Sequence, residues 1–142
     1  MRGRTIALAA VLLAVTFVAQ NPPSAVAAFD PANFTSPRAN PYYPLVAGTT
    51  SVYRGTEDGD RLFEHLTVTD RTRTIAGVQT IVIRDILFAN GRLREKTTDW
   101  YQNDNGGTTW YFGEDTAVYN RKGQIVSTEG TWMAGVLSLI HI

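Results

Sequence analysis

The segment VQTIVIRDILFANGRLREKTTDWYQ, residues 78–102, decides the fold of this chain. Two runs rich in β-branched, aromatic and charged residues flank Asn90-Gly91. This dipeptide readily adopts the positive φ angles that a two-residue type I′ turn requires. The segment therefore predicts an antiparallel hairpin in which Ala89 pairs with Arg92.

An uninterrupted register, counted outward from this turn, places Val82 opposite Asp99. Arg84 then has Glu95 and Asp99 as diagonal neighbours on one face, at roughly 7 to 8 Å between Cα atoms. These three side chains predict either a solvated ion-pair ladder or a site for a ligand carboxylate. Both faces of the hairpin mix apolar and charged residues, so we expect strong twist or a β-bulge near Arg84-Asp85.

The rest of the chain after residue 48 is rich in threonine, valine, isoleucine and aromatics, punctuated by glycine and asparagine. This pattern is typical of consecutive antiparallel strands joined by tight turns. Further strands are expected at 49–54, 61–69, 108–112, 116–119 and 124–127, with turns at 55–59, 70–77, 103–107, 113–115 and 120–123. The predicted fold is mainly β, an antiparallel up-and-down meander forming a curved sheet or half-barrel.

The first 28 residues are typical of a signal peptide helix. A short basic start precedes an apolar run at 6–19, and Ala-Val-Ala at 25–27 has the small-x-small pattern read by signal peptidase. The run is too short to span a bilayer as a stable anchor, which takes about 20 apolar residues. We expect bacterial export to the periplasm or the medium, with cleavage after Ala27 or Ala28.

All six prolines precede residue 45. Because proline fixes φ and removes a backbone donor, residues 29–47 are expected to form an extended arm on the surface of a β domain spanning 48–136. Aromatic side chains of the arm are expected to dock on that domain: Phe29, Phe34, Tyr42 and Tyr43.

Composition excludes several classes of chemistry. The 142 residues include 13 basic and 13 acidic side chains, two histidines and no cysteine. Disulfides, thiolate metal sites and cysteine nucleophiles are therefore excluded. The balanced charge gives no electrostatic reason to expect a nucleic-acid partner, and we expect none. The loop 103–107 carries oxygen side chains but lacks the ligand pattern of an EF-hand, which favours a hairpin loop. We expect no metal and no cofactor.

Aromatic and acidic residues gather at 99–101 and 110–115, on two neighbouring strands. Aromatic rings beside carboxylates suit a sugar or a small amphipathic ligand. The candidate ligand-binding residues are Trp100, Trp110, Tyr111, Arg84, Asp99 and Glu114. The alternative is that the rings alternate across the sheet, filling the core on one side. Asp99 and Glu114 would suit a glycosidase if their carboxyl groups lay about 5 to 9 Å apart and burial raised the pKa of one of them; no catalytic residue is assigned.

Four motifs together resemble a family of exported bacterial proteins to which no activity is assigned. They are NPYYPL at 40–45, DWY at 99–101, WYFGED at 110–115 and GTWMAGV at 130–136. The resemblance covers roughly residues 40–136 and implies secretion and a β-rich fold. It also implies about a hundred further residues, so that the β domain here would be a truncated fragment.

The last six residues, LSLIHI at 137–142, resemble the translation of a transposase-based sequencing adapter, CTG TCT CTT ATA CAC ATC. Such a tail is a processing scar to be left out of fold reasoning. The alternative is a genuine terminal strand, and the codons of these residues decide between the two.

The sequence alone assigns no activity. The leading hypothesis is a secreted or periplasmic, non-enzymatic β protein that binds a small or amphipathic ligand. The alternative is a structural or interaction module of the cell envelope whose sheet edges or proline-rich arm meet another protein. A carbohydrate-active enzyme is a weaker alternative.

Overall fold

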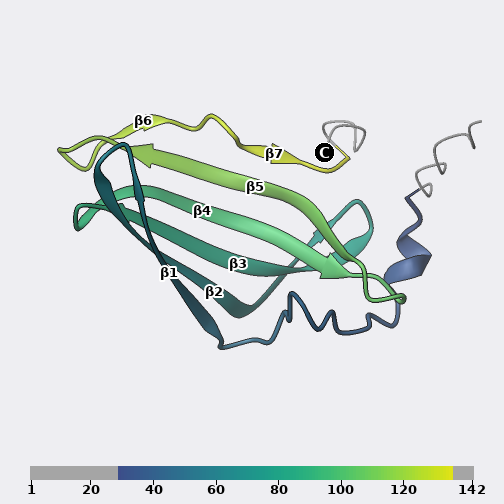
Figure 1. Cartoon of the computed structure of the whole chain (residues 1–142). Helices are drawn as coiled ribbons and strands as arrows, with labels where there is room; N and C mark the ends of the chain where they lie inside the picture. Colours follow the sequence, from purple (N-terminus) through teal and green to yellow (C-terminus); the bar gives the residue numbers. More distant parts are fainter. Residues whose placement is uncertain (1–28, 136–142) are drawn as a thin grey trace, which may run out of the picture.

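The computed structural model describes residues 29–135, in which seven strands form one antiparallel sheet (Figure 1). The strands are β1 (Thr50–Glu57), β2 (Asp60–Ile75), β3 (Val78–Ala89), β4 (Arg92–Asn103), β5 (Thr109–Tyr119), β6 (Ile125–Ser127) and β7 (Trp132–Met133). Strand order follows the sequence from β1 to β6, and β7 pairs with β5 on the same edge as β6 but at a different part of the strand. The predicted mainly β, antiparallel meander is therefore confirmed, as an open sheet with β1 at one edge.

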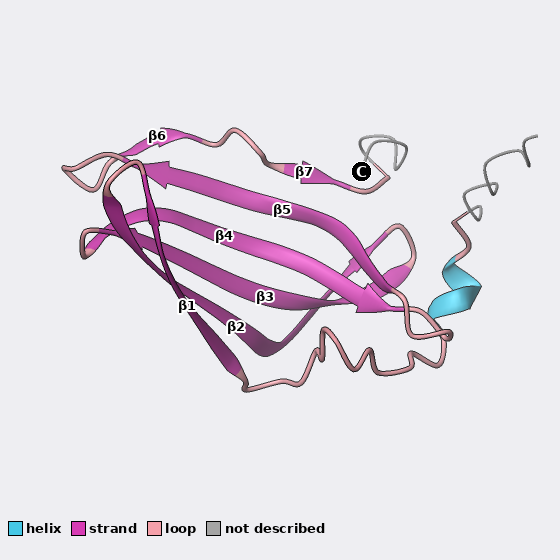
Figure 2. Ribbon diagram, in the orientation of Figure 1, coloured by secondary structure: helices cyan, strands magenta, loops and turns pink. Residues whose placement is uncertain are grey.

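Helical structure within residues 29–135 is confined to one 3-10 turn, η1 (Pro31–Phe34), shown in Figure 2. In this part of the chain no helix has the length and apolarity to cross a membrane. The expected signal peptide and the expected adapter-derived tail fall outside the described residues.

Three two-residue turns join the first four strands, each with positive φ at both central positions. They are Asp58-Gly59, Ala76-Gly77 and Asn90-Gly91. The turn expected at 90–91 is confirmed, with φ of 52° and 76°. The long turn expected at 70–77 is wrong, because β2 continues to Ile75 and absorbs an irregularity between Val68 and Thr72 within the strand.

Strand β5 passes without a break through residues 113–115, where a turn was expected. Gly113 has φ of 135°, and a Cβ at this position would collide with the carbonyl oxygen of Trp132. Glycine is needed here because β7 lies directly against the backbone of β5, so the residue that suggested a turn marks a strand contact instead.

The β3–β4 register corrects one prediction. Ala89 pairs with Arg92 as expected, but a shift between Leu87 and Phe88 moves every later pair by one residue. Ile83, not Val82, therefore lies opposite Asp99. Since successive side chains point to opposite faces, Arg84 and Asp99 lie on different faces of the sheet and form no ladder.

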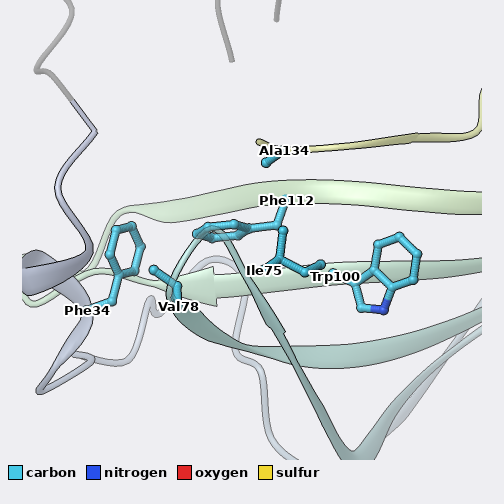
Figure 3. Packing of buried hydrophobic residues seen from close by; sticks show 6 residues of the cluster. All are labelled: Phe34, Ile75, Val78, Trp100, Phe112 and Ala134. Atoms are coloured by element: carbon cyan, nitrogen blue, oxygen red, sulfur yellow. The ribbon is translucent and has the colours of Figure 1, made fainter. Parts of the chain in front are cut away.

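One face of β4 and β5 carries the cluster that we call the aromatic core, drawn in Figure 3. Its buried members are Phe34, Ile75, Val78, Trp100, Phe112 and Ala134. Phe34 comes from η1, whose first turn is capped by the Asp30 carboxylate accepting from the backbone N–H of Ala32 at 2.9 Å. The Phe34 ring lies 5.5 Å from the ring of Phe112 in an edge-to-face arrangement.

The arm runs from η1 around the β4–β5 turn and on to β1 (Figure 1). The backbone N–H of Arg38 donates to the carbonyl of Asp104 at 3.0 Å, and that of Asn105 to the carbonyl of Asn33 at 2.7 Å. The ring of Tyr43 then packs on the ring of Tyr101, with centroids 5.5 Å apart. This contact lies on the face of β4 opposite the aromatic core. The docking prediction holds for Phe29, Phe34 and Tyr43. It is wrong for Tyr42, which is 95% exposed.

Candidate functional site

The face of the sheet opposite the aromatic core collects carboxylates and tyrosines. Register places its residues in three rows across the strands. The rows are Tyr53, Glu64, Leu87, Glu95 and Val118; Ser51, Leu66, Asp85, Thr97 and Thr116; and Val68, Ile83, Asp99, Glu114 and Trp132. No basic residue occupies any of these positions. We call this surface, together with Tyr101 and Tyr111, the acidic face.

Its centre is the hydroxyl group of Tyr111. This group lies 2.6 Å from Asp99 Oδ1 and 2.9 Å from Glu114 Oε2, and it donates toward both. Asp99 and Glu114 are directly paired across β4 and β5. The tyrosine hydroxyl has one proton and can donate it to only one of the two carboxyl groups at a time. The other short contact is a hydrogen bond when that carboxyl group carries a proton and donates it to the hydroxyl oxygen.

Burial shifts the ionisation of Asp99, which is 6% exposed. Desolvation is the main cause that raises its pKa to about 6, the hydrogen bond from Tyr111 acts in the opposite direction, and neighbouring carboxylates of the acidic face raise it further. Desolvation and the adjacent carboxylates also raise the pKa of Tyr111. The cluster therefore retains a proton at pH values where an ordinary aspartate is ionised.

A second acidic pair lies on the same face. Desolvation, a hydrogen bond to Glu64 and nearby carboxylates together raise the pKa of Asp85 to about 7. The Oδ1 atom of Asp85 is buried and has no hydrogen-bond partner within the described residues. A proton held between Asp85 and Glu64 removes the repulsion of two adjacent negative charges.

Aromatic rings continue from this cluster along the sheet. Tyr101 stacks on Tyr111 with ring centroids 4.4 Å apart and planes 13° from parallel. Trp132 meets Tyr111 edge-on at 5.2 Å. The rings therefore lie beside the buried carboxyl group of Asp99.

The structure divides the six candidate residues into two groups. Asp99, Tyr111 and Glu114 come together on the acidic face. Trp100, Trp110 and Arg84 belong to the opposite face. Trp110 packs against Phe29 and Phe34, and its indole N–H donates to Asp104 Oδ2 at 3.0 Å. The two tryptophans therefore follow the alternative given for the aromatic rings, in which rings alternate across the sheet and fill the core on one side.

A cavity of about 450 Å³ lies along the edge of the sheet where β7 meets β5. Its lining residues are Arg73, Trp100, Glu114, Asp115, Thr131, Trp132 and Met133. The Arg73 guanidinium stacks over the Trp100 ring, 4.4 Å from the ring centroid. Two indoles and a thioether thus form the apolar walls, and charged groups of both signs stand around them. Of the candidate residues, Trp100 and Glu114 line this cavity.

The oxygen-rich β4–β5 loop is a hairpin loop, as expected. Asp104 Oδ1 accepts from the backbone N–H groups of Gly106 and Thr108, at 2.9 and 2.8 Å. Asn105 Oδ1 accepts from the backbone of Ser36 at 2.7 Å. Protein donors occupy these oxygens, and no group of three or more histidine or acidic side chains in residues 29–135 is arranged to hold a metal ion.

Sequence reasoning did not place Tyr101, Glu64, Asp85 or Arg73 among the candidate site residues. Tyr101 had a usable signal, because it alternates with Trp100 and so belongs on the same face as Asp99. The carboxylates on β2 and β3 depended on the register, which the extra residue Arg94 on β4 changed. No protein-family model matches the chain, and no curated protein or solved structure shows significant similarity to it. The resemblance to exported bacterial proteins stays a prediction.

Proposed function

We propose that this chain is an exported binding protein whose cavity at the β5–β7 edge takes a small amphipathic ligand. The observation that carries the proposal is the cavity of about 450 Å³ lined by Trp100, Trp132 and Met133. Small-molecule sites typically have volumes of about 300 to 1,000 Å³, apolar walls and a few polar groups that fix orientation. Export rests on the leader-like residues 1–28.

The chemistry of the cavity defines the ligand class. An apolar body would lie against Trp132 and Met133, and a polar head would meet Arg73 and Thr131 at the rim. The Arg73 guanidinium makes no ion pair within the described part of the chain. It is therefore free to bind a carboxylate, sulfonate or phosphate group on the ligand.

The test uses 8-anilinonaphthalene-1-sulfonate, an apolar probe with one anionic group, titrated into the full chain. We expect saturable binding of one probe per chain with a change in tryptophan fluorescence, because two of the three tryptophans line the cavity. Arg73→Gln should weaken binding about three- to tenfold, in line with the loss of one charge-assisted hydrogen bond. Arg71→Gln is the matched control, since Arg71 is an exposed arginine of the same strand.

Equal affinity in the two variants, or binding without saturation, would contradict the proposal. Because this dye also binds loosely packed states, cooperative thermal unfolding must be verified under the same conditions.

The second candidate function, an interaction module, is favoured by the sheet edges. All eight residues of β1 are exposed, including Tyr53 at 50%, and β6 exposes Ile125 and Val126 at 57% and 59%. Unpaired strand edges with apolar side chains are ready to pair with another chain. Concentration-dependent association that Val126→Lys abolishes, with no saturable probe binding, would favour this function.

A glycosidase is not proposed. Asp99 and Glu114 are close enough for such a pair, since both contact one hydroxyl group. However, Asp99 is 6% exposed and does not line the cavity, so a sugar would not reach its carboxyl group.

A further inference from the structure

A second cavity, also of about 450 Å³, lies at the end of the sheet where the β3–β4 and β5–β6 turns meet the start of β2. It is far less apolar than the first, because most of its lining side chains are charged or amides. The residues that matter here are Asp60, Asn90, Arg92, Arg94, Asn120 and Arg121.

The amide side chains in this lining are engaged in building the turns. Asn90 Oδ1 accepts from the backbone N–H of Arg61 at 3.0 Å, and Asn90 Nδ2 donates to Asp60 Oδ1 at 2.7 Å. Asn120 Oδ1 accepts from the backbone N–H groups of Lys122 and Gln124, at 2.9 and 3.0 Å. The groups left free to meet a ligand are therefore mainly the cationic ones.

Three guanidinium groups face one carboxylate in this lining, although the whole chain has no net charge. Arg94 is held by an ion pair with Glu57, with Nη1 at 2.8 Å from Oε2. Arg92 and Arg121 are exposed and make no ion pair within residues 29–135. Two unpaired guanidinium groups thus stand at one cavity, each carried by a backbone that a turn or strand fixes.

We propose that this cavity binds a small phosphorylated ligand through Arg92 and Arg121, with Arg94 as a third, tethered cation. The guanidinium fork matches two phosphate oxygens at once, and such charge-assisted bonds are roughly twice as strong as neutral ones. The volume exceeds what a single phosphate group needs, so it favours a diphosphate or a phosphorylated small molecule. A neutral sugar would find the amide groups already occupied.

Isothermal titration of the full chain with inorganic pyrophosphate at low salt tests this site. We expect saturable binding of one pyrophosphate per chain, and Arg92→Gln with Arg121→Gln together should weaken it by at least about tenfold, a loss of about 1.4 kcal/mol. The matched control is Arg71→Gln with Arg84→Gln, which removes the same charge from exposed positions outside the cavity. It should change the affinity by less than about twofold.

Two results would overturn the proposal. One is the absence of saturable binding. The other is an equal loss in both double variants, which would show that pyrophosphate responds only to net charge. Because the four arginines are exposed, all variants should keep the near-ultraviolet circular dichroism of the parent chain. This site does not depend on the β5–β7 cavity, so Arg73→Gln should leave pyrophosphate binding unchanged.

Discussion

The aromatic core and the acidic face occupy opposite sides of the same two strands. On one side, Trp110 and Phe112 pack against rings from the arm. On the other side, Asp99 and Glu114 share one tyrosine hydroxyl in a mostly buried setting. Burial of carbon stabilises a fold at any pH, whereas burial of carboxyl groups stabilises it only while they hold protons. Alternation along one backbone therefore gives the protein a pH-independent layer and a pH-dependent one.

The largest expected effect comes from the aromatic core. Phe112 is 1% exposed and contacts rings of both Phe29 and Phe34. Phe112→Ala should lower the free energy of unfolding by about 3 to 5 kcal/mol, because a buried cavity replaces the ring. Urea denaturation measures it. Val126→Ala, at a side chain 59% exposed, should cost less than about 0.5 kcal/mol. Similar losses in the free energy of unfolding for the two variants would mean that the aromatic core contributes little to stability.

The next effect is a dependence on pH from the acidic face. The native pKa values of Asp85, about 7, and Asp99, about 6, exceed the ordinary value of 3.8. The folded state therefore binds more protons than the unfolded state between about pH 4 and pH 7, and stability falls as pH rises through that window. After allowance for solvent screening, we expect a loss of about 2 kcal/mol.

Asp85→Asn tests the origin of this slope. The amide donates to Glu64 without a titrating proton, so the variant should be more stable than the parent at pH 7.5 and its slope should flatten. Asp115→Asn, on the exposed side of β5, should keep the parental slope. Denaturation curves whose midpoints rise from pH 4 to pH 7 would contradict this assignment.

A smaller effect is expected from Tyr111→Phe. The change removes the one donor shared by Asp99 and Glu114 and keeps the ring. The free energy of unfolding should fall by about 1 kcal/mol at pH 7.5 and by less at pH 4.5, where the carboxyl groups are protonated and can donate to each other. Thermal denaturation at the two pH values measures the difference. Tyr42→Phe, at a tyrosine 95% exposed, is the control and should change neither value.

Local turn chemistry made the fold predictable. Asn90-Gly91 and the alternation of β-branched residues indicated the central hairpin, and the glycines marked most of the remaining turns. The exceptions are informative. Gly113 looked like a turn because the sequence does not show that β7 lies against it, and that contact joins residues distant along the chain.

The candidate site was less predictable because it depends on register. A single extra residue between Leu93 and Glu95 separated Arg84 from Asp99 and placed Asp99 opposite Ile83. No local signal distinguishes a bulge there from one at the predicted position two residues earlier on β3. Asp99, Tyr111 and Glu114 still came together, because their pairing depends on β5, where Tyr111 and Glu114 lie near the same strand irregularity.

The arm has a consequence for the order in which the chain assembles. Ser36 and Asn105, which share a hydrogen bond, lie 69 residues apart along the chain. A ribosome releases the arm first, yet its binding surface exists only after β4 and β5 have emerged and paired. The segment that is synthesised earliest thus docks late, onto a β4–β5 hairpin that has already formed. Until it does, the rings of Phe112 and Trp110 have no cover from Phe29 and Phe34.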